Sequence, residues 1–166
     1  MKQKSNSCEG GCSCGQVRYK IFAEPLIVHC CHCSFCQRQT GAAFALNALF
    51  EADKVSLIKG EVDETMTPSP SGKGQNIARC PDCKTAVWSH YDMGGIKQGI
   101  RFIRVGTLDN PEILPPDVHI YTVSKLPWVN LSNEKNVYKE FYNFKEVWSE
   151  EHNNLRVQLL KKAAEG

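Results

Sequence analysis

The sequence predicts a mainly β fold of short antiparallel strands, followed by a C-terminal helical segment. Short apolar runs recur up to Val123 and are separated by Gly, Pro, Asn or Asp, which is typical of antiparallel β proteins. After Glu134 the apolar residues recur instead at steps of three and four, the spacing of one face of a helix. The 166 residues contain no internal repeat, and this length suits one domain.

The expected elements follow one another at short intervals. Residues 17–21 alternate apolar and charged side chains, which predicts a half-buried strand. Residues 34–40 are expected to form a single helical turn, and residues 69–74 read Ser-Pro-Ser-Gly-Lys-Gly, which predicts a loop. One or two helices are expected within residues 134–164. The other expected strands are residues 26–30, 44–50, 55–58, 77–79, 86–91, 100–105 and 118–123.

Composition and charge exclude several classes of function. The net charge is +2 and no block of Lys and Arg stands out, so a nucleic-acid partner is not expected. Residues 1–7 are polar and lack the apolar core of a secretory signal. The longest apolar run, residues 42–50, is too short to span a membrane. We therefore expect a cytoplasmic protein, in which nine cysteines predict metal ligands rather than disulfides.

Two of the cysteine clusters are pairs. A pair of thiolates one to four residues apart can hold one ion, and a structural zinc takes four protein ligands. Cys12 and Cys14 together with Cys80 and Cys83 would complete such a site. Each pair could instead be a redox dithiol, but the Cys-x-Cys spacing suits that role poorly. Cys8 stands outside the clusters and is expected to have no role.

The middle cluster supplies three thiolates, from Cys31, Cys33 and Cys36. Three ligands leave a fourth position for water or substrate, which is the pattern of a reactive zinc and suits a thiol substrate. A closed site with Cys30 or His32 as the fourth ligand is an equally weighted alternative. Because neighbouring side chains of a strand point apart, Cys30 is expected to be a small buried apolar side chain.

Four stretches of the chain carry a resemblance to a known family: residues 11–19, 31–36, 79–83, and 106–109 continued by 116–121 and 124–128. Together they resemble the glutathione-dependent formaldehyde-activating enzymes, a family that also includes centromere protein V. The resemblance implies a fold called a β-tent. It also implies an activity that joins formaldehyde to glutathione to give S-hydroxymethylglutathione, classed as a carbon–sulfur lyase reaction.

The same resemblance implies two zinc ions per chain. Family members hold a structural zinc with the first and third clusters and a catalytic zinc with the second, here Cys12, Cys14, Cys80 and Cys83 for the former and Cys31, Cys33 and Cys36 for the latter. It further implies a zinc-binding β domain over residues 8–130. The C-terminal helical extension, residues 131–166, would be packed on this domain or appended to it.

The sequence departs from the family pattern at several positions. Lys84 follows the third cluster, where Gly is usual, and Gln37 follows the last catalytic cysteine, where Arg is usual. Arg38, one residue later, is the candidate contact for a carboxylate of glutathione or another thiol, with a solvated surface charge as the alternative. His32 could orient a thiol or simply point away. His119 is expected to support a zinc site by hydrogen bonding rather than as a ligand.

These features lead to two hypotheses from different classes. The first is a zinc-dependent carbon–sulfur lyase-like enzyme acting on the adduct of a small aldehyde with glutathione or another thiol. The second is a non-catalytic, zinc-stabilised binding module, as the centromere protein V branch suggests. A nucleic-acid-binding zinc ribbon is weaker than both, because the chain has a single Cys-x2-Cys knuckle and little excess positive charge.

Overall fold

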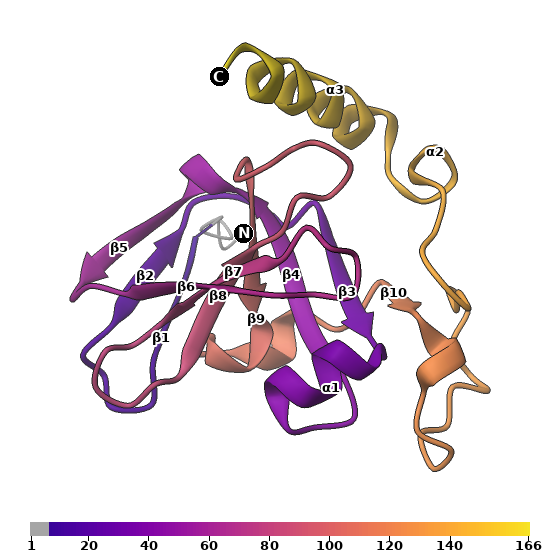
Figure 1. The fold of residues 1–166 in the computed structure, drawn as a ribbon, viewed down its shortest axis with the longest axis horizontal. Coiled ribbons are helices and arrows are strands. Elements are labelled where there is room, and N and C mark those ends of the chain that lie inside the picture. Colours follow the sequence, from indigo (N-terminus) through magenta and orange to yellow (C-terminus); the bar gives the residue numbers. More distant parts are fainter. Residues whose placement is uncertain (1–6) are drawn as a thin grey trace, which may run out of the picture.

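The computed structural model describes residues 7–166, which form two β-sheets and a C-terminal helical segment (Figure 1). The smaller sheet has three antiparallel strands in the order β1–β2–β5, with bounds Cys8–Gly11, Arg18–Ile21 and Val55–Lys59. The larger sheet has seven strands in the order β10–β3–β4–β9–β8–β7–β6. Its strands are β3 (Ile27–Cys31), β4 (Ala45–Glu51), β6 (Asp63–Thr67), β7 (Gln75–Arg79), β8 (Ala86–His90), β9 (Ile100–Arg104) and β10 (Val118–Ile120).

Three α-helices accompany the sheets in the described part of the chain. Helix α1 (Ser34–Thr40) follows β3, and α2 (Phe144–Val147) and α3 (Glu150–Glu165) end the chain. The expected mainly β class, with antiparallel strands and C-terminal helices, is confirmed. The pairing of β10 with β3 is parallel, and it brings residues far apart in sequence to one sheet edge.

The first apolar core contains side chains from both sheets. Tyr19 and Ile21 of β2 are completely buried, as the alternating pattern predicts, and they pack with Phe50 of β4 and Trp88 of β8. The rings of Tyr19 and Trp88 meet edge to face, with centroids 5.7 Å apart. This core therefore joins the small sheet to the large one.

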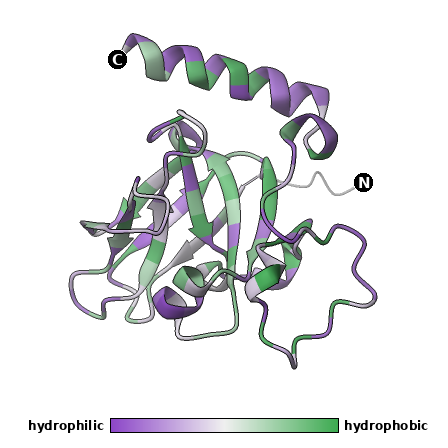
Figure 2. Cartoon of the chain, turned by 45° about the vertical axis from the view of Figure 1, so that its right-hand side comes forward, coloured by the Kyte–Doolittle hydropathy of each residue, from purple (hydrophilic) through white to green (hydrophobic). Residues whose placement is uncertain are grey.

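The second apolar core contains Ile27 and Cys31 of β3 and Val118 and Ile120 of β10, together with side chains of the C-terminal segment. Leu49, Phe102 and Ile120 of the large sheet belong to the same buried cluster as Tyr142 and Trp148. The Trp148 Nε1–H donates to the Tyr142 hydroxyl oxygen over 2.7 Å. Figure 2 shows that the strands are largely apolar, whereas α3 is mostly hydrophilic with apolar bands. One of these apolar residues, Leu159, is buried in this core.

The sequence-based prediction missed β1 and β6. Strand β6 is the edge strand of the large sheet, and four of its five residues are exposed, so it has no apolar alternation to detect. Strand β1 is short and ends in two glycines, which weakens any strand signal. Its Cys8, expected to have no role, pairs in register with Ile21 of β2.

The C-terminal helices begin later than the apolar spacing indicates. Helix α2 starts at Phe144, and the chain before it is not helical. Here Val137 forms a parallel bridge with His119, and the Tyr138 N–H donates to the His119 carbonyl over 2.9 Å. Because the β10 edge offers these backbone partners, the aromatic residues of this segment pack from an extended chain rather than from a helix face.

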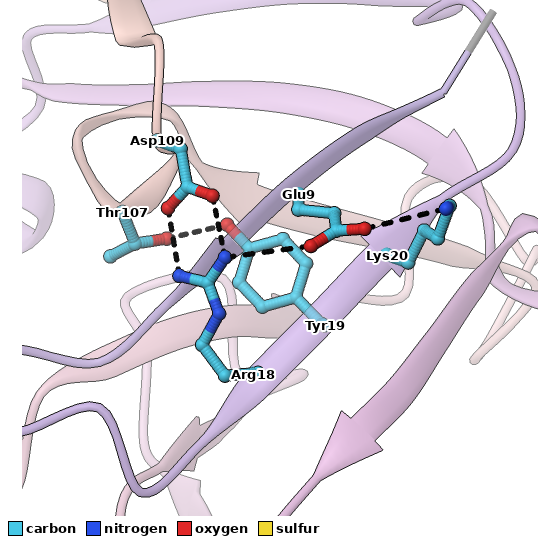
Figure 3. A network of polar contacts seen from close by, with 6 residues as sticks. All are labelled: Glu9, Arg18, Tyr19, Lys20, Thr107 and Asp109. Carbon is cyan, nitrogen blue, oxygen red and sulfur yellow. Dashed lines mark hydrogen bonds and ion pairs between the residues drawn. The ribbon is translucent and has the colours of Figure 1, made fainter.

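A polar network explains the Gly-Thr-Leu-Asp motif at residues 106–109. Figure 3 shows that the Arg18 guanidinium forms a bidentate ion pair with Asp109, and that Glu9 lies between Arg18 and Lys20. The ion pair lowers the pKa of Asp109 below its usual range. The Tyr19 and Thr107 hydroxyls meet at 2.7 Å, which places the motif against β2. The motif is therefore structural: it stabilises the strands from which the first cysteine pair extends.

Two expectations about targeting have different outcomes. No helix within residues 7–166 combines the length and apolar character needed to cross a membrane. The expectation that residues 1–7 lack a secretory signal falls almost entirely outside the described residues.

Candidate metal sites and pocket

The first and third cysteine clusters meet at one end of the small sheet. Cys12 and Cys14 lie on the turn after β1, and Cys80 and Cys83 lie on the turn between β7 and β8. Their four sulfurs all lie within 4.8 Å of one another. The Cys12–Cys14 and Cys14–Cys80 sulfur separations are 3.5 and 3.8 Å. Sulfurs around a tetrahedral zinc, with Zn–S bonds of about 2.3 Å, lie about 3.8 Å apart, so these four thiols fit that ion.

Both turns are shaped by local hydrogen bonds. The Val17 N–H donates to the Cys12 sulfur over 3.2 Å, and Gly15 adopts a φ of 77° that allows the turn to close. On the other turn the Thr85 hydroxyl lies 3.2 Å from the Cys83 sulfur. This hydroxyl is the main cause that lowers the pKa of Cys83 to about 5, and a lowered thiol pKa favours metal binding.

Lys84 occupies a conformation that favours glycine. Its φ is 62°, in the left-handed region, because its N–H must reach the Cys80 carbonyl over 3.1 Å to close the turn. An L side chain is strained there by about 1–2 kcal/mol, whereas glycine is not.

We therefore expect Lys84→Gly to raise the free energy of unfolding of the metal-loaded protein by about 0.5–1 kcal/mol, after the entropy that glycine adds to the unfolded chain. The lost ion pair between Lys84 and Asp63 is exposed and long, at 3.8 Å, and contributes little. Chemical denaturation measures the change. Lys135→Gly, at an exposed lysine with an ordinary φ, is the matched control and should not stabilise.

The middle cluster lies where β3 ends and α1 begins. Cys31 is the last residue of β3, Cys33 caps the N-terminus of α1, and Cys36 is in its first turn. The Cys36 N–H donates to the Cys33 sulfur over 3.3 Å. Contacts with the Cys31 and Cys36 thiols, followed by the helix N–H groups, lower the pKa of Cys33 to about 3. The same contacts raise the pKa of Cys31. A cation would allow all three sulfurs to be thiolates together, so this donor set fits a soft divalent metal.

A pocket of about 440 Å³ opens over the middle cluster. Its lining is mostly apolar and aromatic, and no described Lys or Arg is part of it. Buried His29 is one of the lining residues, and burial lowers its imidazole pKa to about 3. The His29 Nε2 meets the Tyr142 hydroxyl at 2.7 Å. The lining also includes the three cysteines and Asn47, Ser69, Ser71, Gln75, Tyr91, Phe102, Tyr121 and Phe141.

Tyr121 and Arg104 are site residues that the sequence-based analysis did not single out. Tyr121 lines the pocket with a φ of 53°, and such strain in a residue other than glycine often marks a functional position. Burial is the first cause that raises its phenol pKa, followed by the charges of Tyr91, Cys31 and Cys33. A single sequence gives no sign that a residue other than glycine adopts a left-handed backbone, so Tyr121 could not be found from the sequence.

Arg104 is a buried cation beside the middle cluster. Burial lowers the pKa of its guanidinium, while the nearby Cys36 and Cys31 sulfurs act in the opposite direction. Its Nη1–H donates to the Asn47 side-chain oxygen over 2.6 Å, which fixes its position. Three thiolates around one divalent cation carry a net charge of −1, which the Arg104 charge balances.

We expect Arg104→Met to weaken metal binding at the middle cluster by about 10- to 100-fold, because its three thiolates would lose their buried countercharge. Affinity at the four-cysteine group should not change. Competition with a metal indicator dye measures both constants. Arg101→Met is the matched control on the same strand, since Arg101 stacks on Trp88 instead. Equal losses in both variants would contradict this role.

The other residues singled out from the sequence lie away from the pocket. Arg38 is exposed on α1 and is not among the residues that line the pocket. Gln37 uses its side-chain amide to donate to the carbonyls of His32 and Ser124. The side chains of His32 and Cys30 group with His119 and not with the three cysteines of the middle cluster.

These features define a class: a mainly β protein with two cysteine groups suited to a metal ion and a pocket over one of them. The model of the glutathione-dependent formaldehyde-activating enzyme family matches residues 7–124, so the chain belongs to that family. A Halomonas elongata protein, provisionally named a glutathione-dependent formaldehyde-activating enzyme, is 27% identical over an alignment of 138 residues that covers 76% of this chain and 82% of that protein.

A solved structure is also similar. It is the crystal structure of a Rhodobacter sphaeroides protein, with 15% sequence identity and a TM-score of 0.44, covering 78% of this chain and 98% of the other. The family match ends at residue 124, so α2 and α3 lie beyond it.

Proposed function

We propose that this protein is a zinc-dependent enzyme of the carbon–sulfur lyase type, acting on the adduct of a small aldehyde with glutathione or another thiol. The observation that carries the proposal is the pocket of about 440 Å³ that opens over Cys31, Cys33 and Cys36. In the proposal these cysteines hold the catalytic zinc, and Cys12, Cys14, Cys80 and Cys83 hold a structural zinc. Such a small-molecule site requires no nucleic acid and no membrane. A reducing cytoplasm would keep the thiols available.

Each part of the pocket then has a role. A zinc ion held by the three cysteines would stabilise the substrate sulfur as a thiolate and act as a Lewis acid. Cys33 would stay a thiolate because the Cys31 and Cys36 thiols, followed by the N–H groups at the start of α1, stabilise its charge. Tyr121, kept neutral by its raised phenol pKa, would donate a hydrogen bond to the substrate oxygen. The aromatic lining would keep water from the reacting carbon.

The thiol would extend beyond the pocket. Because the lining holds no described Lys or Arg, carboxylates such as those of glutathione would lie outside it. Arg38 stays a proposed partner for such a group at the surface of α1, where it would act through exposed and therefore weak ion pairing.

We further propose that the catalytic β domain comprises residues 8–130 and that residues 131–166 pack on it as an extension. Tyr142, Trp148 and Leu159 belong to the buried cluster of the large sheet, and Phe141 lines the pocket. The extension would therefore stabilise the domain and shape the wall of the active site.

Thiol titration of the cobalt-substituted protein tests the proposed function. We expect glutathione or a simpler thiol to change the visible absorption of cobalt at the middle cluster, because thiolate would enter its open position. The change should be absent in Cys33→Ser. A wild-type spectrum that no thiol alters, with cobalt bound at this cluster, would contradict the enzyme and favour a non-catalytic binding module.

A further inference from the structure

The chain carries a third group of potential metal ligands. Strand β3 ends with Cys30 and Cys31, and His32 and Cys33 follow directly. Neighbouring side chains of an extended chain point to opposite faces. Cys31 and Cys33 face the pocket, and Cys30 and His32 therefore face the other side of the sheet. Residues 30–33 thus place two pairs of potential metal ligands on opposite faces of the sheet.

Strand β10 completes the second set. It pairs with β3 in parallel, and His119 is in register with Cys30, so their side chains share a face. The two flanking residues, Val118 and Ile120, belong to the core on the pocket side. The only parallel pairing among the described strands of the large sheet therefore places His119 beside Cys30 and His32, 87 residues away from the latter in sequence.

The distances fit a small tetrahedral ion. The His32 Nε2 and His119 Nδ1 atoms lie 3.0 Å apart, and the Cys30 sulfur lies 3.5 Å from the His32 Nε2. All three ligand atoms lie within 4.8 Å of one another. Around a tetrahedral zinc with Zn–N bonds of about 2.0 Å and Zn–S bonds of about 2.3 Å, nitrogens lie about 3.3 Å apart and nitrogen and sulfur about 3.5 Å. Small outward shifts would complete this geometry.

The surroundings also suit a bound ion. The three residues are 2%, 0% and 6% exposed, for Cys30, His32 and His119 respectively, so water does not compete for them. The His119 Nε2 lies 3.6 Å from a carboxylate oxygen of Glu134. This separation is beyond hydrogen-bond distance, and the His119 Nε2 has no hydrogen-bond partner among the described residues. A small approach of the Glu134 carboxylate would give the usual arrangement that orients a metal-ligating imidazole.

A simple hydrogen bond between the two imidazoles explains less of this arrangement. It accounts for the 3.0 Å contact when one nitrogen carries a proton. It does not account for the convergence of a buried thiol on the same point. A cation at the common point would use the two facing nitrogens and the thiolate together.

We propose that Cys30, His32 and His119 bind a third metal ion of the zinc class, on the opposite face of β3 from the catalytic cluster. This ion would join the edge strand β10 to β3, and through Glu134 it would also hold the segment that leads to the C-terminal extension. It would thereby support the Cys31–Cys33 loop from behind. Neither the cysteine spacing nor the proposed function requires this ion, and the enzyme proposal stands without it.

Metal stoichiometry of the full-length protein tests the proposal. After reconstitution with zinc and removal of excess metal, we expect three ions per chain in the wild type, and two in both His119→Gln and Cys30→Val. Cys8→Ser, which removes a cysteine outside the three groups, is the matched control and should retain three. Cys33→Ser should also bind two ions, because it loses the ion of the middle cluster and keeps the ion held by Cys30, His32 and His119. The two proposed sites can therefore be lost independently, so each proposal can fail without the other.

Cadmium NMR of the wild type provides a second readout that needs no variant to fold. Three cadmium resonances are expected, one of them shifted as a site with one sulfur and two nitrogen ligands requires. A wild type that stops at two ions with only sulfur-rich resonances would overturn the third site, as would His119→Gln and Cys30→Val variants that keep three.

Discussion

Replacing Cys80 by serine should remove the metal of the four-cysteine group and cost at least about 4 kcal/mol of folding free energy, because metal-binding energy at a structural site is folding energy. Cys80 is completely buried, and its sulfur lies 3.8 Å from that of Cys14, on a turn 66 residues away. Without the ion, only weaker contacts join these two turns. Zinc content and thermal unfolding by circular dichroism measure the effect.

The control is Cys8→Ser, a half-buried cysteine of β1 that belongs to none of the three groups. It should keep its zinc and unfold near the wild-type temperature. A chelator should reproduce the loss of stability in the wild type. If Cys80→Ser unfolds like the wild type, or if the chelator has no effect, the four-cysteine group does not hold a structural metal.

Replacing Cys33 by serine should lower kcat/KM for the thiol–aldehyde adduct by at least about 100-fold and leave the fold intact. Serine is a preferred N-cap residue, so its hydroxyl can replace the sulfur that accepts the Cys36 N–H at the start of α1. The variant thus removes one thiolate without removing the helix cap. Aldehyde release from the adduct measures turnover, and the melting temperature should stay within a few degrees of the wild type.

The metal count distinguishes the possible causes of such a loss. Cys33→Ser should lose one ion and keep the ion of the four-cysteine group, whereas Cys8→Ser should lose neither activity nor metal. Turnover like that of the wild type in Cys33→Ser would rule out a catalytic metal at the middle cluster. A collapse of the melting temperature would instead show that this cluster stabilises the fold.

The predicted strands that proved correct carry apolar side chains, either on one face, as in β2, or on both faces, as in β3 and β10. Residues 17–21 are an example: Tyr19 and Ile21 are completely buried, and the charged residues between them are half-buried. Strand β6 was missed because an edge strand with polar side chains on both faces leaves no such pattern. Residues 134–143 show the reverse case, in which a helical spacing of aromatic residues was overridden by backbone pairing with β10.

The candidate metal ligands divide in the same way. Spacing within a turn is local, so the sequence by itself indicated the three cysteine clusters. It also indicated that the adjacent side chains of Cys30 and Cys31 point to opposite faces of a strand. That Cys30 and His32 meet His119, that Arg104 lies beside the middle cluster, and that Tyr121 lines the pocket depend on pairings between distant strands. A single sequence does not contain these pairings, because strand order and register result from the packing of the whole chain. The sequence thus determined the family and the cysteine clusters, and only the tertiary structure decided which charges, aromatic rings and histidines surround them.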